Sequence, residues 1–365
     1  MPLAVLKDVP LAPHTTLQVG GVAAYFYRLV KEDDLASLIK FANEKQVPIT
    51  VLGGGSNVLI ADGRIERLVI KNELREISFE EDKESGTILV TAAAGEPWDA
   101  FVELLVTRGL SGLENLSGIP GTVGAAPIQN INAYGAQVAD VIDSVRVYDP
   151  VTGTSKVLSN AECQFGYRDS VFKTPAGASH IVTSVTFRLA PAGAAANMSY
   201  RSASQSVEKY LREQGIVKPA LLDIRNAILH VRSNIGMLEG QFRSAGSFFK
   251  NTTVSAEDFS RIENIVKTQF IELHEKFSPW YWLLPDGKVK LSTAFLMECS
   301  PYNKRTYGEK RWNGVVGLSP KHSLSVVTEV GATANDVCTF VAEIITVVEK
   351  IFGVTIETEV NFISN

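Results

Sequence analysis

Apolar residues recur in the N-terminal half of the chain with two different spacings. Over residues 32–45 (EDDLASLIKFANEK), four apolar side chains are spaced as on one face of a helix, and three acidic residues precede them. Acidic residues stabilise a helix N-terminus, so this stretch is predicted to be helical. Pro97 is expected to open a second helix. Apolar runs and alternating patterns predict strands over 48–54, 67–71, 87–95, 143–149 and 180–189.

The C-terminal part shows mostly the helical spacing. Residues 191–197 (PAGAAAN) predict a linker, and Ser255 with Asp258 forms a capping pair for a helix that follows it. Further helices are expected around 203–214, 218–231 and 334–352, the last of them ended by Gly353.

The chain ends with a stretch, 355–362 (TIETEVNF), whose alternation predicts a strand. Ile356, Val360 and Phe362 would share one face, and Glu359 would lie on the other. This mixture of strands and helices indicates an α+β protein. One or two mixed domains are expected before about residue 225 and another after it.

Composition and charge narrow the class of protein. Of the 365 residues, 45% are apolar and 21% are charged, which is typical of a soluble globular protein with a substantial core. The net charge of −5 gives no reason to expect a nucleic-acid partner. No apolar run approaches the roughly 20 residues of a membrane helix, and the N-terminus lacks the basic start and apolar stretch of a secretory signal. We therefore expect a cytoplasmic protein with no membrane or nucleic-acid partner.

The cysteines and histidines give no sign of a metal site. Cys163, Cys299 and Cys338 are far apart and odd in number, so they form neither a disulfide framework nor a zinc pattern. The five histidines show no His-x-x-x-His pair. No metal is expected.

Two glycine-rich stretches are candidate ligand loops. GGGSN (53–57) follows a predicted strand directly, and its exposed backbone N–H groups could hold a pyrophosphate, although by itself it could also be a tight turn. It is not the Gly-x-Gly-x-x-Gly fingerprint of dinucleotide-binding helices. The second stretch, 117–135 (SGIPGTVGAAPIQNINAYG), combines four glycines with polar side chains, which is unusual for an ordinary surface loop.

Three further residues carry possible chemistry. Ser247 lies in RSAGSFFKN (243–251) with no neighbouring base, so it is not the nucleophile of a hydrolase elbow. Arg168, in FGYRDSVFK, could clamp a carboxylate or form an ion pair with Asp169. Glu359 could be catalytic or simply solvated.

Six blocks of sequence, in this order along the chain, resemble one known family. They are GGGSNVLI, GLENLSGIPGTVGAAPIQNINAYG, CQFGYRDSVFK, GSFFKN, SPKHSLSVV and IETEVNFI. Together they are similar to the UDP-N-acetylenolpyruvoylglucosamine reductases, the flavoenzymes of bacterial peptidoglycan precursor synthesis. The position of Tyr200 favours the longer type of this family, which has a mobile tyrosine loop.

The resemblance implies a fold and a reaction. The fold would be the FAD-binding fold of the vanillyl-alcohol oxidase type (PCMH type), α+β, with two subdomains split near residue 73. The FAD-binding region would span 1–225 and be rejoined by the C-terminal strand 354–365, and 226–353 would form the substrate-binding domain. NADPH would reduce FAD, and the enzyme would then convert UDP-N-acetylenolpyruvoylglucosamine to UDP-N-acetylmuramate, serving cell-wall biogenesis, cell shape and cell division.

The family's catalytic roles fall on three residues of this chain. Arg168 would hold the substrate carboxylate, because a guanidinium keeps its proton and binds carboxylates with paired hydrogen bonds. Glu359 would be a protonated acid that assists the developing anion. Ser247 would give a proton to the carbanion, and Lys250 beside it could ease the loss of that proton.

The family's binding roles fall on two larger sets. The FAD-binding set is Gly53, Gly54, Gly55, Ser56, Asn57, Ser117, Gly118, Ile119, Pro120, Gly121, Gly124, Ala125, Asn130 and Val182. The set for the UDP-sugar substrate is Tyr134, Tyr200, Arg232, Asn251 and Lys290. The chain departs from the family at Ile235, where relatives of the longer type tend to carry a basic residue for the nucleotide diphosphate. Trp280 and its aromatic neighbours are read as core rather than as a stacking surface for uridine.

Two alternatives stay open. The chain could be another FAD-dependent sugar or alcohol oxidoreductase of the same fold, although no histidine or cysteine in the glycine-rich loops could tether the flavin. It could also be a nucleotide-sugar-binding paralogue without catalysis, which the joint presence of Arg168, Ser247 and Glu359 disfavours. A monomer is expected.

Overall fold

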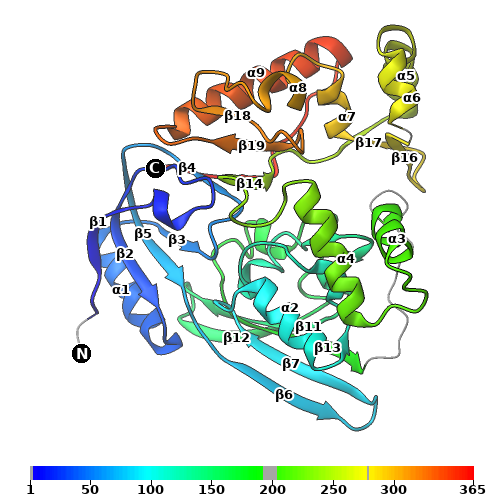
Figure 1. Cartoon of the computed structure of the whole chain (residues 1–365). Coiled ribbons are helices and arrows are strands. Elements are labelled where there is room, and N and C mark those ends of the chain that lie inside the picture. Colours follow the sequence, from blue (N-terminus) through cyan, green and yellow to red (C-terminus); the bar gives the residue numbers. More distant parts are fainter. Residues whose placement is uncertain (1–2, 192–203, 278) are drawn as a thin grey trace. The chain divides into compact units, whose positions relative to one another are not determined.

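The computed structural model describes residues 3–191, 204–277 and 279–365, and its chain divides into two compact units (Figure 1). The first unit comprises residues up to 9, 23–54 and 66–239. The second comprises residues 10–22, 55–65 and 240–365. The boundary therefore falls inside the loop Gly53–Asn57, which supplies residues to both units.

Helices and strands alternate throughout, as expected for an α+β protein. The helices are α1 (Leu35–Lys45), α2 (Trp98–Thr107), α3 (Ser204–Glu213), α4 (Leu221–Asn234), α5 (Ala256–Gln269), α6 (Ile271–Lys276), α7 (Thr293–Glu298), α8 (Lys304–Tyr307) and α9 (Ala334–Phe352). The strands up to β10 are β1 (Leu6–Pro10), β2 (Val22–Leu29), β3 (Ile49–Leu52), β4 (Val58–Ile60), β5 (Arg64–Asn72), β6 (Ile77–Asp82), β7 (Thr87–Ala93), β8 (Leu110–Ser111), β9 (Asn132–Ala133) and β10 (Ala136–Gln137). The remaining strands are β11 (Ile142–Asp149), β12 (Thr154–Ser159), β13 (Ile181–Pro191), β14 (Ser244–Ser247), β15 (Thr252–Val254), β16 (Tyr281–Leu283), β17 (Val289–Leu291), β18 (Val316–Leu318), β19 (Ser325–Thr328) and β20 (Asn361–Ile363).

The first unit holds two main sheets. One has the order β1-β2-β5-β3, and its strands β3 and β5 run parallel with Leu52 opposite Lys71. The other has the order β12-β11-β13-β7-β6 and is antiparallel. Helix α2 covers this second sheet because its apolar stripe, with Trp98 and Phe101, shares one core with Phe187 of β13. The glycine-rich loop 117–125 follows α2 and packs into the same core through Val123.

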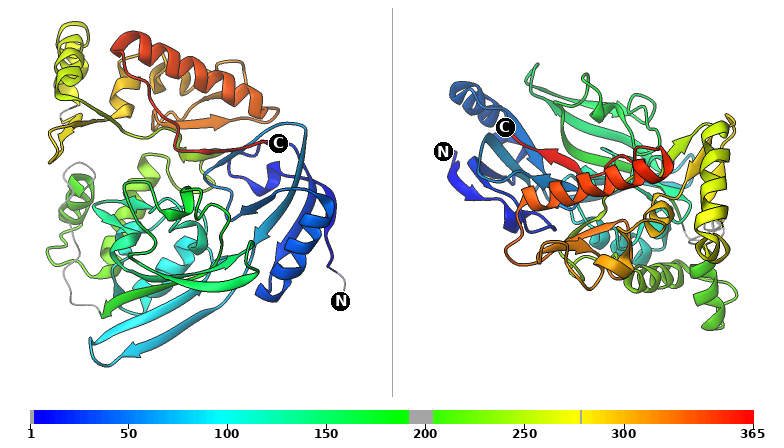
Figure 2. Two further views of the ribbon diagram at one scale, coloured as in Figure 1. Left: turned by 180° about the vertical axis from the view of Figure 1, so that it is seen from behind. Right: turned by 90° about the horizontal axis from the view of Figure 1, so that it is seen from above.

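The second unit is built around helix α9. Its strands form the sheets β14-β19-β18 and β15-β17-β16 and the parallel pair β20-β4. Helix α9 lies against β18, and the views of Figure 2 show it running along that sheet. Its inward residues, among them Phe340 and Ile344, are completely buried. Thr333 caps the helix at its start, and Gly353 ends it with a positive φ of 65°.

Most helices predicted from spacing are confirmed, and the C-terminal strand is not. Ser255 accepts a hydrogen bond from the Asp258 N–H at the start of α5, as expected of the capping pair. In the stretch 355–362, only its last two residues belong to a strand, β20. Val360 is buried, whereas Phe362 is 50% exposed, so the expected shared face is wrong there. The alternation breaks because 357–359 pair with another segment, 248–250, before β20 begins.

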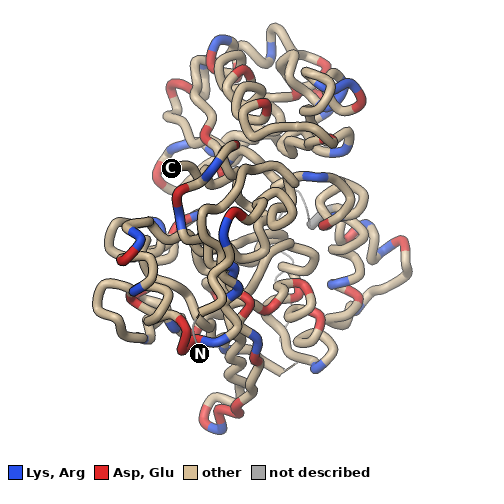
Figure 3. Tube along the Cα trace, turned by 90° about the vertical axis from the view of Figure 1, so that its left-hand side faces the viewer, with Lys and Arg blue, Asp and Glu red and all other residues tan. Residues whose placement is uncertain are grey.

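Charge is spread over both units. Figure 3 shows basic and acidic residues interspersed along the trace. Within the part of the chain that the structure describes, no helix combines the length and the hydropathy that a membrane crossing requires.

Candidate functional site

The two glycine-rich loops touch through their backbones in the first unit. A Cβ atom on Gly54 would lie 2.6 Å from the Cα of Gly121, and one on Gly53 would lie 2.6 Å from the Oγ1 of Thr122. Gly124 is equally confined, because a Cβ there would meet the Cβ of Ala94 at 2.4 Å. Real Cβ atoms essentially never come this close to backbone atoms, so glycine is required at Gly54 and Gly124, whereas at Gly53 only the side chain of Thr122 is in the way.

These loops leave several backbone donors available. Among the described residues, none accepts a hydrogen bond from the N–H groups of Gly53, Gly54, Gly121 or Thr122. Clustered N–H groups without a protein acceptor form an anion-binding nest. The residues present therefore fit the diphosphate of a dinucleotide, which is the group that the FAD prediction requires at this position.

Gly118 is held from both sides by charged side chains. Its N–H donates to Asp99 Oδ1 at 2.6 Å, and its carbonyl accepts from Arg232 Nε at 3.0 Å. Asp99 also binds Arg225 of α4 through two hydrogen bonds of 2.6 and 2.9 Å, and the Arg225 side chain is only 5% exposed. Gly118 has a φ of 72°, which glycine adopts without strain. Helices α2 and α4 thus fix one peptide of the predicted FAD loop.

Tyr134 and Arg232, both predicted to bind substrate, contact each other. Tyr134 is buried, which raises the pKa of its hydroxyl, and the side-chain hydrogen bond with Arg232 opposes that rise. Arg232 further donates to the carbonyl of Met237 at 2.9 Å. Burial lowers the pKa of Arg232, and the neighbouring Tyr134 and Asp99 oppose this effect. Ile235, where the family resemblance led us to expect a basic residue, caps the C-terminus of α4 three residues beyond Arg232.

Arg168 lies in a tight turn with an unfavourable backbone conformation. Gly166 and Asp169 exchange two backbone hydrogen bonds of 2.9 and 3.3 Å, and Arg168 between them has a φ of 53°. Asn130 fastens this turn to the glycine-rich loop by donating to the Gly166 carbonyl at 3.0 Å. Asn130 and Tyr134 also have positive φ values, 45° and 50°. Strained backbone of this kind is concentrated at functional sites.

The other predicted FAD residues of the first unit lie in or beside these loops. The Ser117 hydroxyl is completely buried and donates to the Glu114 carbonyl at 2.6 Å, so it supports the loop from behind. The side chain of Asn130 is likewise bonded within the protein, and its Nδ2 donates to Gln137 Oε1 at 3.1 Å. Val182 is buried in β13, and its carbonyl accepts from Asn72 at 3.0 Å. Ile119 and Pro120 lie between Gly118 and Gly121 in the same loop, and Ala125 ends a short 3-10 turn there.

The second unit brings Ser247, Glu359 and Asn57 into neighbouring segments. The Glu359 N–H donates to the Phe248 carbonyl at 2.8 Å, and Phe249 pairs with Thr358. The side chain of Asn57 donates to the Glu359 carbonyl at 3.4 Å. The register sets Glu359 opposite Phe248, one step from Ser247.

The hydroxyl of Ser247 is half-buried and has no hydrogen-bond partner among the residues described. By contrast, the nearby Ser244 hydroxyl bonds that of Ser325 at 2.6 Å. The ammonium group of Lys250 pairs with Glu357 Oε2 at 3.1 Å, and its expected help to Ser247 stays a prediction. Ser247 therefore differs from Ser244 in this stretch, because its hydroxyl has no protein partner among the residues described.

Asn251 and Lys290 also belong to the second unit and lie on adjacent strands. Asn251 directly precedes β15, and Lys290 is paired with Thr253 of that strand. The side-chain oxygen Oδ1 of Asn251 accepts from the Thr293 N–H at 3.2 Å. Its amide nitrogen makes no bond to another described residue, so it can donate to a ligand. Trp280 is core as expected, 2% exposed and stacked on Phe295.

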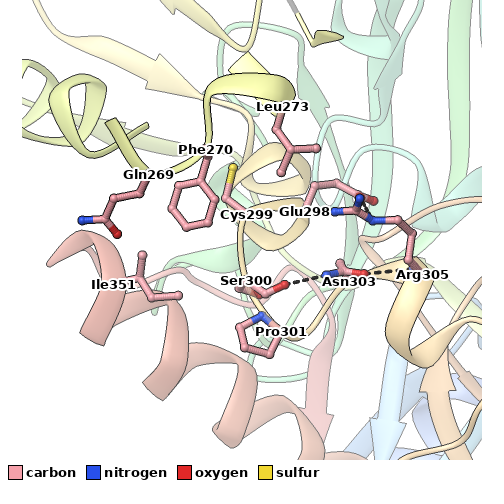
Figure 4. A pocket seen from close by; sticks show the side chains of 10 residues that line it. All are labelled: Gln269, Phe270, Leu273, Glu298, Cys299, Ser300, Pro301, Asn303, Arg305 and Ile351. Atoms are coloured by element: carbon pink, nitrogen blue, oxygen red, sulfur yellow. Dashed lines mark hydrogen bonds and ion pairs between the residues drawn. The ribbon is translucent and has the colours of Figure 1, made fainter. Parts of the chain in front are cut away.

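A pocket of about 470 Å³ in the second unit lies apart from all of these residues (Figure 4). Two of its polar side chains are bonded within the protein, because Asn303 caps α8 and Glu298 accepts from Ser323. None of the predicted site residues lines it, so it does not enter the candidate site.

The structure thus assembles two groups of predicted residues, one in each unit. Arg168 belongs to the first group, and Ser247 and Glu359 belong to the second. Tyr200 lies outside the described residues. Sequence reasoning missed Asp99 and Arg225. One signal could have shown Arg225, since it precedes Arg232 by two helical turns and lies on the same face of α4.

Family models match two separate parts of the chain. Residues 23–159 match the family model of an FAD binding domain, and residues 238–363 match that of the UDP-N-acetylenolpyruvoylglucosamine reductase C-terminal domain. The UDP-N-acetylenolpyruvoylglucosamine reductase of Thermobifida fusca is 37% identical over 97% of this chain and 96% of its own. The one from Azoarcus sp. strain BH72 is 36% identical over 99% of both chains.

A solved structure shows the same fold. It is the UDP-N-acetylenolpyruvylglucosamine reductase of Thermus caldophilus, with a TM-score of 0.64 and 23% identity over 100% of this chain and 99% of its own. The α+β fold with an FAD-binding domain is therefore confirmed. From its sequence identity along nearly its whole length, this chain belongs to the UDP-N-acetylenolpyruvoylglucosamine reductase family.

Proposed function

We propose that this protein is an FAD-containing, NADPH-dependent oxidoreductase that converts UDP-N-acetylenolpyruvoylglucosamine to UDP-N-acetylmuramate for peptidoglycan synthesis. Family membership over nearly the full length supports the reaction. The observation that carries the chemistry is the half-buried Ser247 hydroxyl, which has no partner among the described residues.

The cofactor would be held by the nest of the two glycine-rich loops. The N–H groups of Gly53, Gly54, Gly121 and Thr122 would bind the diphosphate of FAD. Asp99 and Arg232 would keep the Gly118 peptide in position. Bound there and reduced by NADPH, the flavin would supply the hydride that adds to the terminal carbon of the enolpyruvyl double bond. The protein must then stabilise negative charge on the neighbouring carbon and its carboxylate.

Ser247 would deliver the proton that completes the reduction. Its O–H bond breaks as a C–H bond forms at the carbon next to the carboxylate, and the resulting alkoxide regains a proton from water. A serine hydroxyl is a weak acid, but a carbanion is a strong base, and close positioning makes the transfer feasible. A hydroxyl already bonded within the protein, such as that of Ser244, would be less free to do this.

Arg168 and Glu359 would stabilise the same anion. The Arg168 guanidinium would bind the substrate carboxylate, and its strained turn would hold the group in a fixed place. Glu359 would act in its protonated form, because a carboxylate would repel the developing charge. Tyr134, Arg232, Asn251 and Lys290 would bind the UDP-sugar, and Tyr200 is proposed for the same role from its sequence position.

An anaerobic titration tests this proposal. Addition of NADPH should bleach the yellow protein, and the enolpyruvyl substrate should restore the colour as it is consumed. Ser247→Ala should keep bleaching within about twofold of the wild type and lose product formation by at least about 100-fold, as expected for loss of a general acid. Ser244→Ala is the matched control and should keep both steps.

The same titration separates the alternatives. Bleaching without consumption of the enolpyruvyl sugar would favour another FAD-dependent sugar or alcohol oxidoreductase of this fold. Absence of bleaching would favour a nucleotide-sugar-binding protein without catalysis. Equal loss of both steps in Ser247→Ala would contradict the role given to Ser247.

Three further features are proposed with the function. The FAD-binding region would span 1–225 together with 354–365, and 226–353 would bind the substrate. The protein would be a cytoplasmic monomer without a nucleic-acid partner, since a nucleotide sugar and NADPH are substrates of the cytoplasm. Light scattering on the purified protein would test the monomer.

A further inference from the structure

Lys71 lies at the edge of the sheet where the glycine-rich loop begins. It is close to the end of β5, opposite Leu52 in the parallel neighbour β3, and Gly53 follows Leu52 directly. Its ammonium group donates to the Gly53 carbonyl at 2.5 Å. The carboxyl ends of two parallel strands thus bring a cation to the loop, and ligands of α/β sheets bind outside such strand ends.

The charge of Lys71 is incompletely matched by the protein. The side chain is half-buried, and burial lowers the pKa of its ammonium group. Glu73 and Glu239 oppose this shift, whereas Arg28 adds to it. Glu73 is itself bound by Arg28 through hydrogen bonds of 2.7 and 3.0 Å. Within the part of the chain that the structure describes, Lys71 forms no ion pair of its own, and two of its three N–H donors have no acceptor.

A half-buried cation beside an anion-binding nest can bind the same anion as the nest. Gly53, whose carbonyl Lys71 binds, and Gly54 both carry N–H groups without a partner among the described residues. The nest offers partial positive charge, and Lys71 would add a full one. Burial removes water from the Lys71 ammonium group, and hydrogen bonds to a bound anion would replace the lost contacts with water.

We propose that Lys71 is a further cofactor-binding residue, which donates a hydrogen bond to the diphosphate of FAD. The proposal rests on the proposed function only in that FAD is the ligand of the nest. The ammonium group of Lys71 would supply the part of the FAD affinity that depends on charge and salt. The backbone N–H groups would supply the rest, which remains when Lys71 is replaced.

The rival role for Lys71 is to hold the Gly53 carbonyl and nothing more. In that case the loop would lose its shape when Lys71 is replaced, and the loss would not depend on salt. A contact with the diphosphate would instead be charge-dependent, since salt screens the attraction between an ammonium group and a phosphate.

The test is FAD binding by flavin-free protein, followed by flavin fluorescence at several KCl concentrations. Lys71→Met should weaken FAD binding by about 10- to 100-fold at low salt, as expected for a hydrogen bond to a charged group. The affinity of Lys71→Met should also fall less steeply with salt. Lys71→Arg should recover most of the affinity. Lys40→Met removes the same charge at a site whose side chain is 79% exposed and should match the wild type.

Each outcome decides the proposal. Wild-type affinity and salt dependence in Lys71→Met would overturn it and leave the proposed function intact. A salt-independent loss shared by Lys71→Met and Lys71→Arg, with a lower unfolding temperature of the flavin-free protein, would also overturn it in favour of the rival role. Failure of the wild-type protein to bind FAD would overturn the proposed function itself, and the inference with it.

Discussion

Replacement of Asp99 by alanine is expected to release the Gly118 peptide of the FAD loop. Asp99 accepts two hydrogen bonds from Arg225 and one from the Gly118 N–H. The Arg225 side chain is 5% exposed, so in Asp99→Ala a nearly buried guanidinium would lose its main partner. Glu103, 3.8 Å from Arg225 and 65% exposed, is too weak a substitute.

The size of the effect follows from these contacts. Breaking a fully buried ion pair costs about 3–5 kcal/mol, and a hydrogen bond to a charged group contributes about 1.5–3 kcal/mol. Asp99 is itself 39% exposed, so water partly replaces what is lost. We therefore expect Asp99→Ala to lower the free energy of unfolding by about 2–4 kcal/mol. Glu103→Ala removes an acid beside the same arginine and should cost less than about 1 kcal/mol.

Urea unfolding measures this difference, and hydrogen exchange locates it. In Asp99→Ala, the backbone amides of a peptide covering 113–121 should exchange faster than in the wild type, because the Gly118 N–H loses its acceptor. If Asp99→Ala and Glu103→Ala were equally stable, the buried pair would not be what holds the loop. If hydrogen exchange in the 113–121 peptide were as slow in Asp99→Ala as in the wild type, Asp99 would not be what holds the Gly118 peptide in place.

The pH dependence has a definite sign. Burial alone would raise the pKa of Asp99, but the hydrogen bonds from Arg225 and the Gly118 N–H outweigh it, so the net pKa is lowered. A lowered folded pKa contributes stability above the unfolded value, about 3.9, and that contribution is lost as the pH falls through the folded value. The stability gap between wild type and Asp99→Ala should therefore be constant near neutral pH and shrink below about pH 4.

Two other predictions concern packing. Gly54→Ala places a Cβ 2.6 Å from the Gly121 backbone and should weaken FAD binding by at least about tenfold in the fluorescence titration, whereas Gly86→Ala, with open space around it, should leave the affinity unchanged. Wild-type affinity in Gly54→Ala would mean that the two loops can separate freely. Burial raises the pKa of both Cys163 and Cys299 to about 12, so a thiol reagent at pH 8 should leave both unmodified in the folded protein and label them after unfolding. Rapid labelling of either in the folded state would contradict their burial.

Several site residues could not have been assigned their partners from sequence. Asn130 is recognisable as part of an unusual loop, but its bond to Gly166 joins residues 36 positions apart. Asp99 and Arg225 are 126 positions apart, and each alone looks like an ordinary charged residue of a helix. The ion pair between Lys250 and Glu357 is another contact of this kind, because adjacency in the chain does not decide which way a side chain points.

The amino-acid sequence by itself determined the local elements and the identity of the chemical groups. Helices such as α9 follow from apolar spacing, the Thr333 cap and the stop at Gly353, all of which act within a few residues. Ordered blocks of motif residues identified the family. Only the tertiary structure decided why Gly54 must be glycine, which charged side chains hold Gly118, and that the Lys71 ammonium group binds the Gly53 carbonyl. Those facts depend on contacts between distant segments, which packing selects and local spacing does not encode.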